Sequence, residues 1–175
     1  MAETERADRE TCDLLVDGCN VLLPDGGVES DYGIAIRDGV IVGVGPSSDL
    51  EHRFEAEDLM DGSDKLAMPG FIDAHTHLAQ QLLRGGVVDE PPIVWQRILI
   101  PFERSLTEED LYWGAKLGCV QMAKSGITCF ADSGTGEMEP IIRAAIETGM
   151  RGNFARMSRD GGSFIPDRFK DPAPV

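Results

Sequence analysis

The chain has 175 residues, of which 42% are hydrophobic, a size that suits one domain or two small ones with a packed core. Its 31 acidic residues outnumber its 16 lysines and arginines and give a formal net charge of −15, which argues against the basic surface that nucleic-acid binding requires. No stretch approaches the roughly 18 uninterrupted apolar residues of a membrane-spanning helix, so we expect neither nucleic acid nor a membrane as a partner.

The N-terminal segment and the charge pattern predict the cellular location of the protein and its salt environment. Residues 1–10 are charged and lack the apolar core of a signal peptide, which predicts a cytoplasmic protein. The acids are scattered and few of the bases are lysine, a surface that suits a salt-rich cytoplasm, so we hypothesise a halophilic host. The four cysteines show no C-x-x-C spacing and are interpreted as small apolar side chains.

Residues 1–67 have the pattern of a small β-domain. Short apolar or alternating runs are separated by Asp-Gly pairs at 17–18, 25–26 and 38–39, which are strong turn signals. The clearest hairpin is centred on 38–39, and 45–48 is expected to end the strand series. We predict a β-sandwich-like domain without chemistry of its own, with strands at Asp13–Val16, Asn20–Leu23, Gly33–Arg37 and Val40–Val44.

From Met68 onward the pattern changes to strands alternating with helices, which indicates parallel βα units and an α/β fold. Strands are predicted near 70–77, 127–132 and 152–157, the second of them as a buried β-branched strand, and 158–175 has the composition of a loop. The second domain is therefore expected to span 68–175.

Helix signals lie between these strands. A helix start is marked by a capping residue and its end by a glycine in the left-handed region. We predict a loop or short helix at Leu78–Val87, a short helix at Ile93–Ile100 that stops before Pro101, a long helix from the cap Thr107 to Gly126, and a helix at Glu139–Thr148.

Two of the three histidines, His75 and His77, lie one residue apart at the end of the first of these strands. Side chains two apart in a strand share a face, so both imidazoles could bind one divalent metal ion. Asp73 would share that face by the same parity. The alternative is a pair of histidines that bind nothing, because a His-x-His pattern is short. The third, His52, is interpreted as a solvated surface residue.

The sequence around the pair narrows the interpretation. The run P-G-F-I-D-A-H-T-H-L at 69–78 resembles the first barrel strand of the amidohydrolase superfamily, and A-Q-Q-L-L-R-G-G at 79–86 resembles the branch of methylthioadenosine/S-adenosylhomocysteine deaminases and triazine chlorohydrolases. The resemblance implies a TIM-type (β/α)₈ barrel, with His75 and His77 as ligands of a catalytic Zn²⁺ or, alternatively, Fe²⁺. Hydroxide generated at this metal would attack an aromatic carbon of the substrate.

The same resemblance implies two substrate-binding residues. Trp95 … Pro101-Phe102-Glu103 is similar to a family pattern in which the glutamate accepts hydrogen bonds from ribose hydroxyls. A solvent-facing glutamate is the alternative for Glu103. Gly149-Met150-Arg151 … Arg156 is similar to a pattern whose second arginine contacts substrate, and the alternative for Arg156 is an ion pair with a nearby acid.

The family completes its site with a histidine on strand five, a His-x-x-Glu on strand six and an aspartate on strand eight. A (β/α)₈ barrel takes about 250 residues, and only three of its strands are predicted here. We therefore expect the N-terminal part of a longer amidohydrolase, with no catalytic residue beyond the metal ligands, and Asp73 as a structural residue. Residues 1–175 alone are expected to be inactive and, because of an open sheet edge, prone to aggregate.

The function implied is hydrolytic removal of an exocyclic amino group from a purine nucleoside or related heterocycle, a small-molecule substrate. A chlorohydrolase or another heterocycle deaminase is the alternative of the same class. A truncated, non-catalytic remnant is the alternative of a different class. Because such barrels often associate, homo-oligomerisation of a full-length form stays open.

Overall fold

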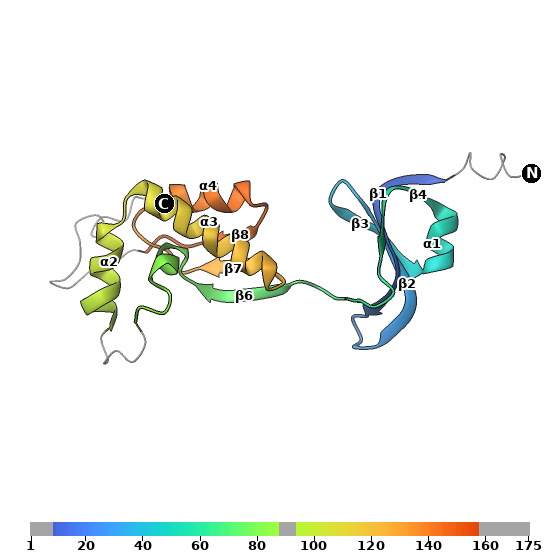
Figure 1. Cartoon of the computed structure of the whole chain (residues 1–175), viewed down its shortest axis with the longest axis horizontal. Helices are drawn as coiled ribbons and strands as arrows, with labels where there is room; N and C mark the ends of the chain where they lie inside the picture. Colours follow the sequence, from blue (N-terminus) through green and yellow to red (C-terminus); the bar gives the residue numbers. More distant parts are fainter. Residues whose placement is uncertain (1–8, 88–93, 158–175) are drawn as a thin grey trace, which may run out of the picture. The chain divides into compact units, whose positions relative to one another are not determined.

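The computed structural model describes residues 9–87 and 94–157. The chain divides into two compact units, Met1–Pro69 and Gly70–Val175 (Figure 1). Within the described residues, no helix is long and apolar enough to cross a membrane.

The N-terminal unit is built on one five-stranded mixed sheet with strand order β3-β2-β1-β4, in which β5 also pairs with β1. β1 is antiparallel to β2 and parallel to β4 and β5, and β2 is antiparallel to β3. The elements are β1 (Glu10–Leu22), β2 (Val28–Arg37), β3 (Val40–Pro46), α1 (Ser47–Arg53), β4 (Phe54–Asp61) and β5 (Leu66–Ala67).

The predicted hairpin between β2 and β3 is confirmed. Arg37 pairs with Val40, so Asp38 and Gly39 form a two-residue loop. Both have positive φ, 52° and 72°, as a type I′ turn requires, and this explains the Asp-Gly pair.

Two expectations about the N-terminal unit are wrong. The Asp-Gly pair at 17–18 does not end a strand, because β1 continues through it with register shifts on both sides of Cys19. The strand series also does not stop at 45–48, since α1 and then β4 follow. β4 is rich in acids, and its apolar alternation is limited to Phe54 and Ala56. It is a strand because it pairs with β1 and buries Phe54 at 2% exposure.

The second unit contains a parallel three-stranded sheet of order β6-β7-β8 (Figure 1). The three predicted barrel strands are confirmed as β6 (Phe71–Thr76), β7 (Ile127–Asp132) and β8 (Arg151–Phe154). The connecting elements are the 3₁₀ helix η2 (Leu78–Leu83), the π-helical turn η3 (Trp95–Leu99), α2 (Ile100–Ser105), α3 (Glu108–Lys124) and α4 (Glu139–Glu147).

Helix α3 begins and ends where the sequence predicts. The Thr107 hydroxyl accepts a hydrogen bond from the Asp110 backbone N–H, and the Asp110 carboxylate accepts one from the Thr107 N–H, which makes a full capping box. Gly126 follows the helix with φ of 76°. The helix predicted to stop before Pro101 instead continues through it, because Pro101 lies at the start of α2, directly after the wider π turn of η3.

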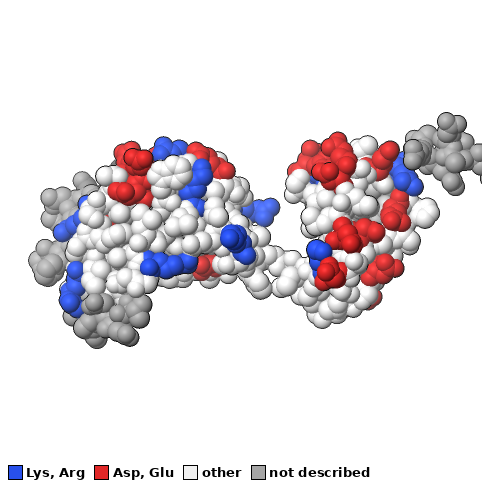
Figure 2. Space-filling model, in the orientation of Figure 1, with Lys and Arg blue, Asp and Glu red and all other residues white. Residues whose placement is uncertain are grey.

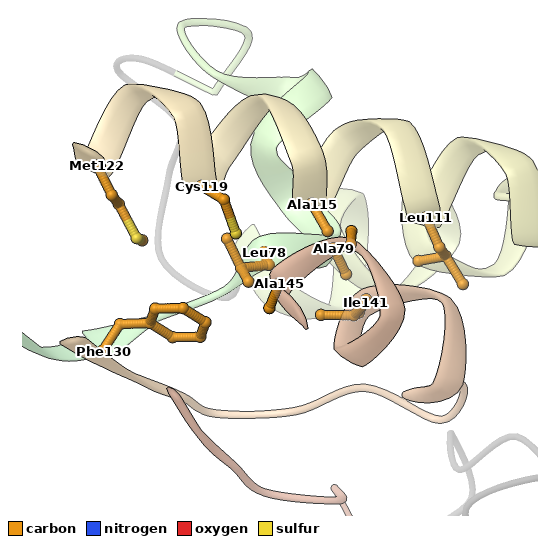
Figure 3. Packing of buried hydrophobic residues seen from close by; sticks show 10 residues of the cluster. Leu78, Ala79, Leu111, Ala115, Cys119, Met122, Phe130, Ile141 and Ala145 are labelled. Carbon is orange, nitrogen blue, oxygen red and sulfur yellow. The ribbon is translucent and has the colours of Figure 1, made fainter. Parts of the chain in front are cut away.

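The core of the second unit lies where α3 and α4 pack on β7 (Figure 3). The Met122 end of the buried face of α3 lies nearest the Phe130 ring, and its Leu111 end lies nearer Ile141 of α4 (Figure 3). Burial raises the pKa of the Cys119 thiol on this face. The cluster consists of Leu78, Ala79, Leu111, Ala115, Cys119, Met122, Phe130, Ile141, Ala144 and Ala145.

Gly118 allows α3 to approach η2 closely. A Cβ atom at this position would lie 2.7 Å from Leu78 Cδ2 and 2.9 Å from Gln81 Cγ. We expect Gly118→Ala to destabilise the protein by about 1–3 kcal/mol through overpacking, even though alanine favours helix more than glycine does. Urea unfolding measures this, with Ala123→Gly on the exposed face as a helix-propensity control. An unchanged or higher stability in Gly118→Ala would contradict the close approach.

Candidate metal centre at the strand ends

His75 and His77 lie at the carboxyl end of β6 and face each other edge to face. Their ring centroids are 5.1 Å apart with an interplanar angle of 79°. His75 is exposed and His77 is half-buried. Both line one open pocket of about 320 Å³, together with Thr76, Gln80, Gln81, Leu83, Arg84, Val87 and Leu99.

The geometry of the pair fits a shared divalent ion. Two imidazoles that bind one tetrahedral ion through nitrogens about 2.0–2.1 Å from it have ring centres on the order of 5 Å apart. His77 Nδ1 is buried and has no hydrogen-bond partner, although buried polar atoms are nearly always paired. In the two described stretches, no group of three His, Cys, Asp or Glu side chains could hold a metal, so this part of the chain offers two ligands.

Hydrogen bonds with the last residue of β7 and with the loop that follows it hold the end of β6 in place. The Ser133 N–H donates to the Thr76 carbonyl at 2.9 Å, and Thr76 is the residue between the two histidines. The Asp132 carboxylate, 3% exposed, accepts hydrogen bonds from the N–H groups of Leu78 at 2.8 Å and Gly134 at 2.7 Å. The Ser133 hydroxyl lies 3.0 Å from His75 Nδ1. The histidine pair is therefore held from both sides by contacts to one neighbouring loop.

Asp73 does not line the histidine pocket, although strand parity predicts that it shares a face with His75 and His77. The pairing of β6 with β7 shifts between Asp73 and Thr76, where three residue steps on β6 match two on β7. Asp73 lines an adjoining depression, which shares three lining residues with the histidine pocket: Thr76, Gln81 and Arg84. Its carboxylate accepts the His75 backbone N–H at 3.2 Å. Its contacts are those of a structural residue.

Glu103 of α2 is buried, with 6% exposure, so the solvent-facing alternative is wrong. Its Oε1 accepts a hydrogen bond from Gln80 Nε2 at 2.7 Å, and its Oε2 accepts one from the Thr135 hydroxyl at 3.2 Å. Gln80 also lines the histidine pocket. The carboxylate is thus connected to that pocket through one side chain.

Arg156 follows β8, at the same end of the parallel sheet as the histidines, and is exposed. It lines a different depression, of about 390 Å³, together with Glu137 and Glu139. The structure therefore does not bring Arg156 into the pocket of His75. His52, on α1, is exposed as predicted, and its Nδ1 lies 2.5 Å from the Ser48 carbonyl oxygen.

Sequence reasoning missed the residues that support the site. Asp132, Ser133 and Thr135 contact the ends of β6 and α2, and Gln80 contacts Glu103. A signal was present, because the predicted strand at 127–132 ends in an acid that is followed by small polar residues, and barrel enzymes place functional side chains at such strand ends.

The sequence matches one protein family and is similar to several known enzymes. Residues 66–166 match the amidohydrolase family. The 5-methylthioadenosine/S-adenosylhomocysteine deaminase of Desulforamulus reducens is 39% identical over 146 residues, which are 82% of this chain and 34% of that protein. The enzyme of the same name from Pyrococcus furiosus is 44% identical over 126 residues, 71% of this chain and 28% of that protein.

The fold is also similar to those of solved structures. An adenosine deaminase from Xanthomonas campestris with bound zinc has a TM-score of 0.76 and 31% identity, over 82% of this chain and 34% of that one. An atrazine chlorohydrolase from Arthrobacter aurescens, complexed with zinc, has a TM-score of 0.75 over 91% of this chain and 40% of that one. At 23% identity, the latter shows the fold alone.

The chain spans about a third of the length of the deaminases that it matches, 34% in the case of Desulforamulus reducens. The family match begins just before β6 and includes His75, His77, Glu103 and Arg156. The strand order, the parallel βα connections and the histidine pair at the end of β6 agree with that match. The chain belongs to the amidohydrolase family.

Proposed function

We propose that this chain forms the first part of a metal-dependent amidohydrolase that hydrolyses an exocyclic C–N bond of a purine nucleoside or a related heterocycle. The proposal rests on the histidine pair, whose ring centroids are 5.1 Å apart. His77 Nδ1 is buried and has no hydrogen-bond partner, which supports it. The similarity to methylthioadenosine/S-adenosylhomocysteine deaminases and to a zinc-containing adenosine deaminase supports the substrate class and zinc as the metal.

The two histidines would hold the ion as neutral imidazoles, each through the lone pair of one ring nitrogen. The ion would lower the pKa of a water molecule, so that hydroxide is available near neutral pH. In the balanced reaction, water adds at the amino-bearing ring carbon and ammonia leaves, which gives the oxo product.

Glu103 would bind the sugar of a nucleoside substrate. A carboxylate suits a sugar because each of its two oxygens can accept hydrogen bonds from hydroxyl groups. Gln80 and Thr135 each donate to one of these oxygens and hold the carboxylate in place. Arg156 would contact a more distant part of the substrate, since it lines a different depression from the histidines.

The formal net charge of −15 supports a small-molecule substrate and argues against a nucleic acid, because phosphate contacts need basic patches. On the face that Figure 2 shows, acidic side chains predominate on the N-terminal unit, whereas the second unit displays both acidic and basic side chains.

Release of ammonia tests the proposal. Because this chain covers about a third of its relatives, the most direct test uses a chimera in which residues 1–157 of this chain replace the matching N-terminal part of the Desulforamulus reducens deaminase. We expect the zinc-loaded chimera to deaminate methylthioadenosine or adenosine, and its His77→Ala variant to lose at least about 100-fold in kcat/KM. Residues 1–175 alone are expected to be inactive.

The controls separate the alternatives. A chimera that is folded by circular dichroism and loaded with zinc, yet releases no ammonia from methylthioadenosine, S-adenosylhomocysteine, adenosine or guanine, would contradict deamination. Chloride release from a chlorotriazine by the same chimera would instead support a chlorohydrolase. Retained activity in the His77→Ala chimera would contradict the metal-ligand role.

A further inference from the structure

One face of α3 is apolar although it points away from the core. Trp113, Leu117 and Val120 are 54%, 43% and 46% exposed. Their spacing of four and three residues places them in one line along the helix, and we call these three residues the outer stripe. A helix that covers a sheet usually carries polar side chains on its outward face. The outer stripe lies opposite the buried residues Leu111, Ala115, Cys119 and Met122.

The neighbours of α3 within its unit leave the outer stripe uncovered. α4 lies along one flank, where Lys116 Nζ donates to a Glu147 carboxylate oxygen at 2.7 Å. η2 packs on the buried side, against Gly114 and Gly118. Neither contact removes the three apolar side chains from solvent. Apolar side chains that gather on a surface in this way often mark a site of association.

The Trp113 ring is held in place on this surface. It packs edge to face against Tyr112, with ring centroids 5.0 Å apart, and the Lys116 ammonium lies 5.8 Å from its centre. Tryptophan is enriched among the residues that contribute most to binding at protein interfaces. A ring that is already ordered loses little side-chain entropy when a partner binds, so Trp113 is suited to anchor a contact.

Opposite charges lie at the two ends of the outer stripe. Glu109 is in the first turn of α3 and Lys124 is in the last, and both are exposed. In the part of the chain that the structure describes, neither side chain is recorded in an ion pair or a hydrogen bond. Two such helices side by side in parallel would bring like charges together, whereas an antiparallel pair brings each acid to a base. The outer stripe is therefore complementary to a second copy of itself.

We propose that the outer stripe is the contact face of a symmetric dimer, in which two α3 helices pack antiparallel with Leu117 of each copy at the twofold axis. At a rise of about 1.5 Å per residue, Glu109 lies about 12 Å before Leu117 and Lys124 lies about 11 Å after it. Glu109 of each copy thus meets Lys124 of the other, and Trp113 meets Val120. Such a contact closes after two subunits. The inference goes beyond the proposed function and does not depend on it.

The size and charge of the contact set the conditions under which it forms. A single helix pair buries less than the roughly 1,200 Å² of a standard interface, so the dimer belongs to the weak class and requires concentrated protein. Each chain carries a net charge of −15, which opposes association. Salt at about 0.15 M screens this repulsion beyond about 8 Å and leaves the ion pairs in direct contact less affected.

Cysteine cross-linking of the full 175-residue chain tests the twofold axis. Leu117→Cys is expected to form a disulfide-linked dimer under mild oxidation, because the axis brings its two copies together. Ala123→Cys is the matched control, since it is exposed on α3 outside the outer stripe. The wild type reports the background from the native cysteines, three of which are buried. Cross-linking of Leu117→Cys at the rate of Ala123→Cys would overturn the proposed axis.

Sedimentation equilibrium tests the apolar part of the contact. Leu117→Gln is expected to raise the dissociation constant of the dimer by about tenfold or more, because two buried leucines are lost at the axis. Leu59→Gln makes the same chemical change at an exposed leucine of β4 and should leave the dissociation constant unchanged.

Charge reversal tests the antiparallel orientation. Lys124→Glu is expected to weaken the dimer by about fivefold or more, because both symmetric ion pairs become repulsive. Adding Glu109→Lys to the same protein should restore most of the affinity. This double variant places both charges unfavourably for the dipole of α3, so its recovery cannot come from a more stable helix. Circular dichroism checks the fold of each variant.

The outcomes separate the dimer from other ways of covering the outer stripe. A chain that stays monomeric when concentrated, or a double variant that does not recover, would overturn the proposal. Association through the open edge of β6 would also overturn it, and would be recognised because it ignores these substitutions and does not stop at two chains. If a later part of a longer protein covers the stripe, Leu117→Gln would lower the Tm of the deaminase chimera and Leu117→Cys would not cross-link it, which again excludes the dimer.

Discussion

Replacing His77 with alanine is expected to reduce Zn²⁺ affinity by more than about 100-fold, a larger loss than that of an outer-shell partner. The described part of the chain offers two clustered ligands, and a site with one imidazole holds zinc only weakly. Isothermal titration of the purified protein with Zn²⁺ measures the loss. His52→Ala is the matched control, because His52 is exposed on α1 and lies outside the pocket.

Without metal, the same substitution is expected to leave the stability of the protein unchanged or slightly higher. His77 Nδ1 is a buried polar atom without a partner, and such an atom costs about 1–3 kcal/mol. In the presence of a chelator, His77→Ala is therefore expected to be as stable as the wild type or slightly more stable, and to lose the rise in Tm that Zn²⁺ gives the wild type. A His77→Ala protein whose Tm still rises with Zn²⁺ as the wild type does would exclude His77 as a ligand.

Replacing Asp132 with alanine is expected to destabilise the second unit by about 2–5 kcal/mol. Its carboxylate is buried and accepts two backbone N–H bonds, and each donor left unpaired costs about 1–3 kcal/mol. Asp132→Asn should lose less, because the amide oxygen can still accept one of the two bonds while the amide nitrogen faces the other donor. Equilibrium urea unfolding with equal m-values measures both.

Asp73→Ala is the matched control for Asp132, since Asp73 lies in the same unit and accepts a single backbone N–H, that of His75, from a less buried position. Its loss of stability should be clearly the smaller of the two. Equal losses in Asp132→Ala and Asp73→Ala would show that the fastening of β6 to β7 does not depend on the buried carboxylate.

The elements that the sequence predicted well are those whose signals are local. The N-cap at Thr107 and the Asp38-Gly39 turn each depend on residues at most three apart, although the full capping box with Asp110 became evident only in the structure. β7 is a short run of β-branched and apolar residues between a helix stop and a loop, and that composition predicts a strand. Its burial is only partial, because Phe130 and Asp132 are buried while Thr128 is exposed.

The elements that it missed depend on partners far away in the chain. β4 is acidic and becomes a strand by pairing with β1, more than forty residues earlier, as in the pair Glu10 and Phe54. The register shift in β6 appears only as a mismatch with β7, and Asp73 does not line the pocket that strict alternation predicts for it. The helix continues through Pro101 because a π turn precedes it, and a π turn has no simple composition signal.

The residues of the candidate site likewise fall into those that a local pattern predicts and those that depend on distant partners. The spacing of His75 and His77 predicted a shared face and a shared ion, and the ring geometry fits that prediction. Resemblance pointed to Glu103 but left its burial undecided, because burial depends on Gln80 and Thr135 from other elements. The contact between Ser133 and His75 joins residues 58 apart, which no local pattern can reveal.

The contacts between β6 and the loop after β7 also determine when, during synthesis, the end of β6 can reach its final structure. The bond from Leu78 to Asp132 joins residues 54 apart, so the end of β6 cannot take up its final shape until α3 and β7 have left the ribosome and docked. A nascent chain that ends at Lys124 has both histidines but lacks the loop that holds them in register. Zinc uptake by ribosome-bound chains of increasing length would therefore report the moment at which the first two strands of the barrel join.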